Sequence, residues 1–204
     1  PVAKDAVPEL WDLLGGAALI ALGNERTLGM GTKPDGSILF YAGLKTSGPD
    51  GKQRLEEADT MEKRVAWFRE NFDGWSELWT PLMAKAMSMV WRPLLVCPTD
   101  QHWDSIAHAT LIVDAAHVMP PYAGEGVNMA MLDALVLARA LLSTPDIASA
   151  IASYEAEMFA RMQHMTQDTM SNTEMFYAQD ASERVVNLFR SFGGAASAPS
   201  ALEH

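Results

Sequence analysis

One stretch of the sequence combines residue types that could bind a flat or anionic ligand. Asp114 follows the apolar run Ala109–Val113, and a carboxylate at a strand end can accept hydrogen bonds from ligand hydroxyl groups. Gly124 and Gly126 lack Cβ atoms, so the backbone can approach a ligand closely there. A helix of small residues is predicted to begin near Gly126, and a helix N-terminus presents unpaired N–H groups to negative charge. The pattern predicts a ligand-binding strand–loop–helix unit.

Other residue types that support catalysis form no such pattern. The histidines show no metal-ligand spacing, and the serines lack a nucleophile turn. The single cysteine, Cys97, excludes a disulfide framework and a multi-cysteine metal site, and it fits a reducing compartment. The sequence therefore predicts no metal site and no catalytic side chain. The residues considered were His102, His108, His117, His164, Ser105 and Ser143.

The elements before this stretch are predicted to begin with a β-layer. The first fifty residues contain apolar runs rich in strand-forming residues, separated by turn residues at Gly23-Asn24 and Pro34-Asp35-Gly36. They are expected to form strands, ending in a loop at Ser47–Gly51. The expected strands are Ala17–Leu22, Arg26–Gly31 and Ser37–Lys45.

Helices are predicted after the β-layer. Asp59-Thr60 can cap a helix in which Met61, Val65, Phe68 and Phe72 recur at helical spacing. A shorter helix is expected over Trp75–Met87, and extended structure over Met89–Val96, where Pro93 favours an edge or a bend. The Trp-rich and Met-rich part between Trp67 and Trp91 is interpreted as core.

The C-terminal part is predicted to be helical. The helix that begins near Gly126 carries an apolar stripe, and Thr144-Pro145 is expected to open the next helix. That helix should bury Ile147, Ile151, Tyr154 and Met158 and continue toward Met175, followed by an amphipathic segment over Ser182–Phe192. The stripe comprises Val127, Ala130, Met131, Ala134, Leu135, Ala138 and Leu141.

Composition narrows the classes of function. The 204 residues carry a formal net charge of −11, which opposes nucleic-acid binding. The apolar stretch around Gly15–Leu22 is too short to span a bilayer, and no basic segment precedes it. We therefore expect no signal peptide, no transmembrane helix and a cytoplasmic location.

The order of elements predicts an α+β fold. A mixed β-sheet layer with helices over residues 1–100 is followed by a strand–loop–helix unit over 101–145. Long helices are expected over 146–192, and a disordered tail with a tag remnant over 193–204.

The pattern over Val113–Asn128 resembles the second flavin-binding motif of class A FAD-dependent monooxygenases, the para-hydroxybenzoate-hydroxylase-like family. Within that family it is most similar to the tetracycline-inactivating flavin monooxygenases. Their motif reads G-D-A-A-H-x-x-P-P-x-x-G-x-G-x-N, and a D-A-L-x-L helix follows it, as Asp133–Leu137 does here. Weaker similarity covers Gly36–Leu44, Asp73-Gly74-Trp75 and Asn172–Phe176.

The resemblance assigns roles to particular residues. Asp114 matches the aspartate that hydrogen-bonds the ribityl chain of FAD, and Pro121 lies beside the isoalloxazine ring. Backbone contacts near the pyrimidine edge of the ring would come from Gly124, Gly126, Val127 and Asn128. Phe40 and Met175 match substrate-pocket positions loosely. The resemblance implies that NADPH reduces FAD, and that oxygen from O2 passes to a phenolic or polycyclic small molecule.

Three departures from the family pattern stand out. Val113 replaces the glycine before the aspartate, and we expect its side chain to pack behind the loop. Glu125 places a carboxylate between the two glycines, and we expect it to face solvent. The G-x-G-x-x-G motif that holds the ADP half of FAD is absent. The chain therefore resembles the C-terminal part of such an enzyme, without its N-terminal Rossmann unit.

Two functions remain open. The chain is interpreted as a fragment of an FAD-dependent monooxygenase that is inactive by itself. The alternative is a non-catalytic ligand-binding or interaction domain that derives from this fold and has lost the cofactor. Asp114 and the Pro120–Asn128 loop favour the first function, whereas Val113 and the missing glycine motif favour the second.

Overall fold

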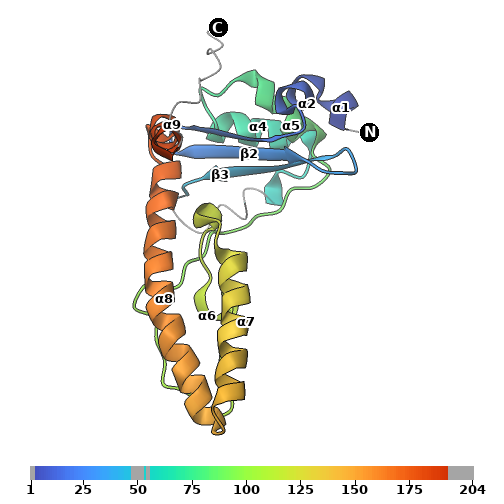
Figure 1. The fold of residues 1–204 in the computed structure, drawn as a ribbon. Helices are drawn as coiled ribbons and strands as arrows, with labels where there is room; N and C mark the ends of the chain where they lie inside the picture. The colour runs from blue at the N-terminus through green and yellow to red at the C-terminus, as the bar shows by residue number, and fades with distance from the viewer. Residues whose placement is uncertain (1–2, 47–52, 54–55, 193–204) are drawn as a thin grey trace. The chain divides into compact units, whose positions relative to one another are not determined.

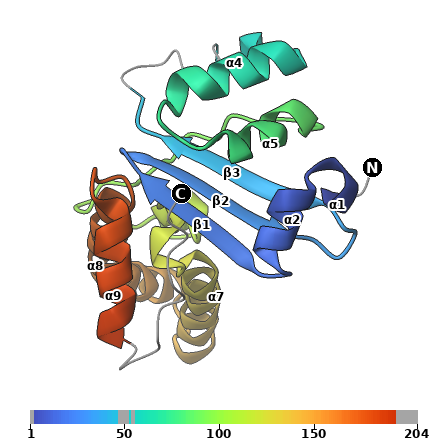
Figure 2. The same ribbon diagram turned by 90° about the horizontal axis from the view of Figure 1, so that it is seen from above.

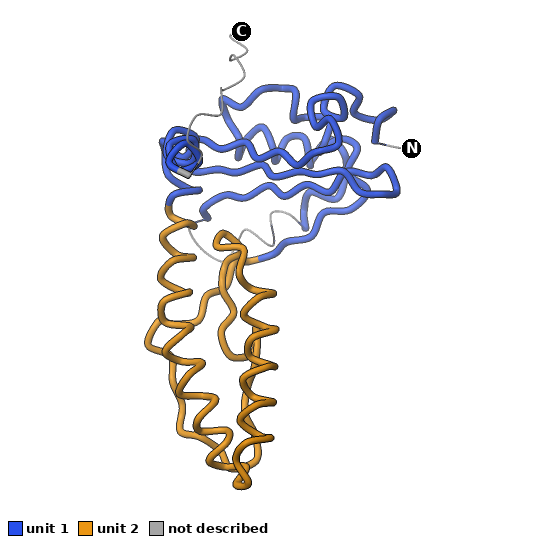
Figure 3. The backbone as a smooth tube through the Cα atoms, in the orientation of Figure 1, with its two compact units in different colours: residues 1–92, 175–204 blue, residues 93–174 orange. Residues whose placement is uncertain are grey.

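The structure, a computed structural model, describes residues 3–46, 53 and 56–192. It divides into two compact units, one containing residues 1–92 and 175–204 and the other residues 93–174 (Figure 3). The expected loop at Ser47–Gly51 and the expected tail over 193–204 lie outside the described residues. The predicted division into consecutive segments stays a prediction.

The first unit is built on a three-stranded antiparallel sheet in the order β1-β2-β3, which Figure 2 shows from above. The strands are β1 (Ala18–Gly23), β2 (Arg26–Thr32) and β3 (Ile38–Leu44). Asn24 and Glu25 both have positive φ, as the tight turn between β1 and β2 requires. Asp35 accepts a hydrogen bond from the Ser37 N–H at 2.9 Å in the second turn. The three predicted strands are confirmed.

The prediction of strands is wrong for the first residues that the structure describes. This stretch forms two helices, α1 (Ala3–Ala6) and α2 (Pro8–Leu14). Pro8 occupies the first turn of α2, where its missing N–H costs nothing. Leu10 and Leu14 are four residues apart and both are buried, so the spacing carried a helical signal that the sequence analysis missed.

The core of the first unit lies between one face of the sheet and its helices. These helices are α4 (Met61–Asn71), η1 (Glu77–Trp79) and α5 (Thr80–Lys85), while α9 (Ala181–Phe192) contacts β1. Thr60 caps α4 by accepting a hydrogen bond from the Lys63 N–H, as predicted. Phe68 and Phe72 are buried and stack at 4.7 Å between ring centroids. The aromatic-rich segment is core, as expected.

The second unit consists of helices and connecting loops. It contains α6 (Asp114–His117), η2 (Pro121–Ala123), α7 (Gly126–Ser143) and most of α8 (Ile147–Phe176). Ile151, Tyr154 and Met158 on α8 are buried as predicted, whereas Ile147 is exposed. The predicted cap is wrong: Asp146, rather than Thr144, accepts the hydrogen bond from the Ser149 N–H at 2.9 Å.

Two expected extended segments form no strand in the described part of this unit. Residues 109–113 have no regular secondary structure, and an isolated bridge between Ile106 and Ala109 is the pairing assigned there. Residues 89–96 are likewise irregular. A strand needs a neighbour to accept its backbone hydrogen bonds, and no other strand is assigned within the described residues of this unit.

Helix α7 begins at Gly126 as predicted, but its apolar stripe faces outward. Val127, Met131, Leu135 and Leu141 are exposed, and Asp133 is the buried residue of the helix. By length and composition α7 could cross a membrane, which the search for longer apolar stretches in the sequence missed because Asp133 and Arg139 interrupt the helix. Such a single helix is weak support for a membrane span.

Candidate functional site

Asp114 stands at the start of α6, directly after a residue with unusual backbone geometry. Val113 has φ 58° and ψ −142°. This region is essentially restricted to glycine, and a β-branched residue is strained in it. The Val113 side chain is half-buried, so the expectation that it packs behind the loop is only partly met. The backbone thus keeps the conformation of a glycine where the family motif has one.

Asp133 on α7 holds this conformation in place. Its carboxylate is fully buried and accepts hydrogen bonds from the Val113 N–H at 2.9 Å and from Arg161 at 2.7 Å. His117 Nε2 lies 2.6 Å from the same carboxylate. Burial raises the pKa of Asp133, but the hydrogen bonds from Val113, His117 and Arg161 outweigh it, so the pKa is lowered. The charged carboxylate therefore ties α6, α7 and α8 together.

The proline loop after α6 is held by a second buried group. The Thr169 hydroxyl on α8 donates to the Pro120 carbonyl at 2.9 Å and accepts from the Ala123 N–H at 3.1 Å. Asn172 donates to the Tyr122 carbonyl at 3.2 Å. Thr169 is fully buried, so its hydroxyl replaces the water that these loop groups would otherwise bind. Helix α8 thereby fixes the shape of the loop.

The N-terminus of α7 is open to a ligand. Gly124 has a left-handed φ of 71°, and a Cβ at Gly124 or Gly126 would meet nothing within 4 Å. No side chain caps the first N–H groups of the helix, which lack partners within the helix itself. Glu125 is half-buried and accepts a hydrogen bond from the Asn128 side chain at 2.9 Å, so it does not simply face solvent.

The six predicted cofactor residues lie in one short stretch of the second unit and are all exposed. The bond from Val113 to Asp133 places Asp114 beside the second turn of α7, about 10 Å along the helix axis from Gly126. This spacing suits a ligand longer than one ring. The six residues are Asp114, Pro121, Gly124, Gly126, Val127 and Asn128.

The two predicted substrate residues lie in the first unit. Phe40 on β3 packs against the core on the helix-covered face of the sheet, where Leu19 and Met30 are its neighbours across the strands. Met175 is half-buried in the last turn of α8. Their roles stay predictions.

The sequence analysis missed the residues that hold the loops. Asp133 was noted only as part of a helix motif, although a carboxylate within an apolar helix signals a buried partner. Arg161 and Thr169 were not singled out. Thr169 lies eleven residues after the buried Met158, which is about three helical turns, so the periodicity of α8 could have placed it on the buried face.

A further buried carboxylate, Glu155, fixes the loop before Asp114. It accepts hydrogen bonds from the Trp103 indole at 2.8 Å, from Thr110 at 2.7 Å and from Ser105. Burial raises the pKa of Glu155, but these neutral donors outweigh it and lower the pKa. Glu155 therefore serves to hold the loop.

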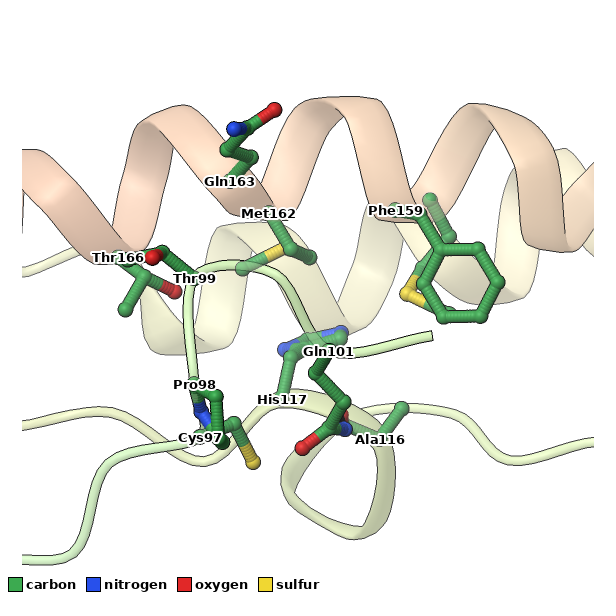
Figure 4. A pocket seen from close by; sticks show the side chains of 11 residues that line it. Cys97, Pro98, Thr99, Gln101, Ala116, His117, Phe159, Met162, Gln163 and Thr166 are labelled. Atoms are coloured by element: carbon green, nitrogen blue, oxygen red, sulfur yellow. Dashed lines mark hydrogen bonds between the residues drawn. The ribbon is translucent and has the colours of Figure 1, made fainter. Parts of the chain in front are cut away.

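A small cavity lies between α8 and the loops, with His117 and Met162 among its lining residues (Figure 4). Its volume of about 20 Å³ would hold roughly one water molecule. It is therefore too small for a flavin or an aromatic substrate, and the candidate site is the open loop surface. Across the described residues, no cluster of three His, Cys, Asp or Glu could hold a metal ion.

Comparisons with known proteins agree with this geometry. Residues 108–169 match the FAD binding domain family. Kynurenine 3-monooxygenase from Salinispora tropica is 32% identical over 162 residues, which cover 79% of this chain and 34% of that protein. The chain is related to class A FAD-dependent monooxygenases. A kynurenine 3-monooxygenase from Stenotrophomonas maltophilia is 38% identical over 79 residues, covering 39% of this chain and 17% of that protein.

Solved structures of flavin monooxygenases share the fold. Klebsiella pneumoniae HpxO, solved with FAD and uric acid, aligns with a TM-score of 0.62 at 19% identity, covering 86% of this chain and 43% of HpxO. FqzB aligns with a TM-score of 0.61 at 21% identity, covering 94% of this chain and 46% of FqzB. The chain spans about a third of the length of the first curated relatives. The α+β fold and FAD as the cofactor are confirmed.

Proposed function

We propose that this chain supplies the flavin-facing part of an FAD-dependent monooxygenase that hydroxylates an aromatic or polycyclic small molecule. The observation that carries the proposal is the open loop from Asp114 to Asn128, anchored from behind by Asp133 and Thr169. FAD, reduced by NAD(P)H, would supply the oxygen chemistry. The residues of this chain would bind the flavin, orient it and shield it from water.

Each loop residue then has a defined task. Asp114 would accept hydrogen bonds from the ribityl hydroxyl groups. Pro121 would cover the ring, and the backbone at Gly124, Gly126, Val127 and Asn128 would donate to its pyrimidine edge. The open N-terminus of α7 would stabilise the negative charge that a reduced flavin carries. No side chain needs to act as a nucleophile.

The substrate is proposed only by class. The relatives are named for kynurenine, and HpxO was solved with uric acid, so flat ring systems are the shared chemistry. A tetracycline-like substrate rests on motif similarity alone. Phe40 and Met175 are proposed as substrate contacts, and the cytoplasm as the location.

Flavin titration tests the proposal. The proposed contacts reach only the ribityl and ring half of FAD, so the chain alone should bind riboflavin and FAD about equally, with dissociation constants of roughly 10 μM or weaker. ADP should not compete, and Asp114→Ala should weaken both flavins by about tenfold or more, since a charged acceptor is lost. Asp168→Asn, which changes another exposed carboxylate on α8, serves as the control.

Flavin fluorescence that stays unchanged up to millimolar riboflavin would contradict the proposal. That result would favour the non-catalytic domain instead. Binding of ADP rather than riboflavin would place the nucleotide, and not the ring, at this chain.

A further inference from the structure

Helix α7 is apolar on two opposite sides. The side containing Asp133, Val136 and Leu137 packs against α8 and the loops of its own unit. On the other side, the α7 stripe (Val127, Met131, Leu135 and Leu142) points outward. Val127 is 73%, Met131 60% and Leu135 45% exposed. A helix at the surface of a soluble protein is normally polar on its outer side, so this stripe has the composition of a covered surface.

The apolar run at 109–113 is also uncovered. Leu111 is 46% and Ile112 37% exposed. Neighbouring residues of an extended chain point to opposite faces, so both faces of the run are open. Continuous apolar runs that include β-branched residues are typical of strands in parallel sheets, which are covered on both faces. In the described chain, the bridge between Ile106 and Ala109 is the pairing assigned to this run.

We infer that the α7 stripe and the 109–113 run dock an α/β nucleotide-binding segment, which pairs a strand with the run and covers the stripe. The inference rests on the proposed flavin site. The contacts proposed for Asp114 to Asn128 reach one half of FAD, and the pyrophosphate of the other half needs its own helix N-terminus. The match to the Salinispora tropica relative leaves about two thirds of that protein uncovered, which is enough chain for such a segment.

Two other occupants fit the structure less well. A membrane would have to surround α7, but its inner side carries the fully buried Asp133, which is paired with Arg161. A second copy of this chain could cover the stripe, yet it would bring no further nucleotide-binding motif to the flavin. The α/β segment is the occupant that covers both surfaces and completes the cofactor site.

The inference makes docking dependent on the cofactor. FAD would contact both parts, so FAD should strengthen the complex and the complex should strengthen FAD binding by the same factor. Riboflavin, which lacks the ADP half, should strengthen the complex far less. This difference separates the docking surface from the flavin site itself.

Co-expression tests the docking. The chain is produced together with a tagged segment of the Salinispora tropica relative that lies outside the match. We expect capture at 1:1 stoichiometry that FAD strengthens by about tenfold or more. Leu135→Lys should reduce capture by about tenfold or more, because it places a charge in the stripe. Val186→Lys on α9 is the matched control, since Val186 is also 45% exposed, and it should leave capture unchanged.

A second measurement does not depend on a separate soluble segment. When the same segment is fused ahead of this chain, the amides of Thr110, Leu111 and Ile112 should exchange hydrogen about a hundredfold more slowly than in the chain alone. Unchanged exchange would overturn the inference, as would equal capture of the two lysine variants. A homodimer that Leu135→Lys dissolves, or flotation with phosphatidylglycerol vesicles, would also overturn it and assign the stripe to a second copy or a membrane. Riboflavin binding without capture would leave the flavin site intact and reject the docking alone.

Discussion

The two units of this chain are stabilised in different ways. The first unit encloses an apolar core in which Leu10, Leu28, Phe68, Phe72 and Met83 are almost fully buried. The second unit buries far fewer apolar side chains, and its loops are held by charged and polar groups instead. It also leaves apolar surface exposed on α7. The comparison teaches that the first unit carries its own folding energy, whereas the second unit is shaped by a few buried hydrogen-bond networks.

The largest effect should come from the core of the first unit. Phe72→Ala removes a ring that stacks on Phe68 and meets Trp75 edge-on at 5.4 Å. We expect a loss of about 3–5 kcal/mol in the free energy of unfolding, because a cavity replaces the ring. Urea unfolding followed by tryptophan fluorescence measures it, with the exposed Tyr41→Ala as control. A loss below about 1 kcal/mol would show that this core does not carry the unit.

The polar network of the second unit should give the next effect. Asp133→Asn leaves Arg161 without its buried carboxylate partner, and breaking such a pair costs about 3–5 kcal/mol when the geometry cannot relax. The exposed Asp168→Asn is the control. We expect the loss to appear as faster hydrogen exchange over residues 113–117. If exchange stays unchanged there, Asp133 does not hold the loop.

Asp133 and Glu155 also predict the response of the second unit to acid. Both have a lowered pKa in the folded state. Their stabilising contribution is therefore complete above the unfolded pKa values, near 4, and is lost as pH falls through the folded values. Hydrogen exchange measured between pH 6 and pH 3 should show loops of this unit opening before the first unit unfolds. Simultaneous opening of both units would contradict the distinction between them.

Thr169→Val should have a smaller effect, confined to the proline loop. The variant keeps the shape of the side chain but leaves the Pro120 carbonyl and the Ala123 N–H without their partner. A loss of about 1–3 kcal/mol is expected. The Thr173→Val variant, which removes only a bond within α8, is the control. Equal losses in the two variants would mean that the loop does not depend on Thr169.

Val113→Gly should have the smallest effect, and in the stabilising direction. Glycine adopts the observed φ of 58° without strain, and the relief of about 1–3 kcal/mol exceeds the entropy cost of glycine, near 0.5–1 kcal/mol. A rise in melting temperature is expected, whereas Val118→Gly, at an ordinary φ of −54°, should lower it. A fall for both variants would show that packing of Val113 outweighs its strain.

The sequence predicted elements whose signals are local. The β-hairpins, the Thr60 cap and the start of α7 depend on turn residues, a cap and helical periodicity, and all are confirmed. It could not predict whether residues 109–113 form a strand, because strand pairing depends on residues distant in sequence. It also could not tell which side of α7 faces inward, since both sides are apolar. The candidate loop was found from its motif, but Arg161 and Thr169 lie far along the chain from it.

The geometry at Val113 has a consequence for how relatives of this chain are recognised. A search pattern that demands glycine before the aspartate would reject this sequence, although its backbone follows the same path there. The position is described better by its torsion angles than by one letter. Patterns that admit other residues at this position, and require instead a buried acidic residue nineteen positions after the aspartate, would retrieve more distant members without losing the structural criterion.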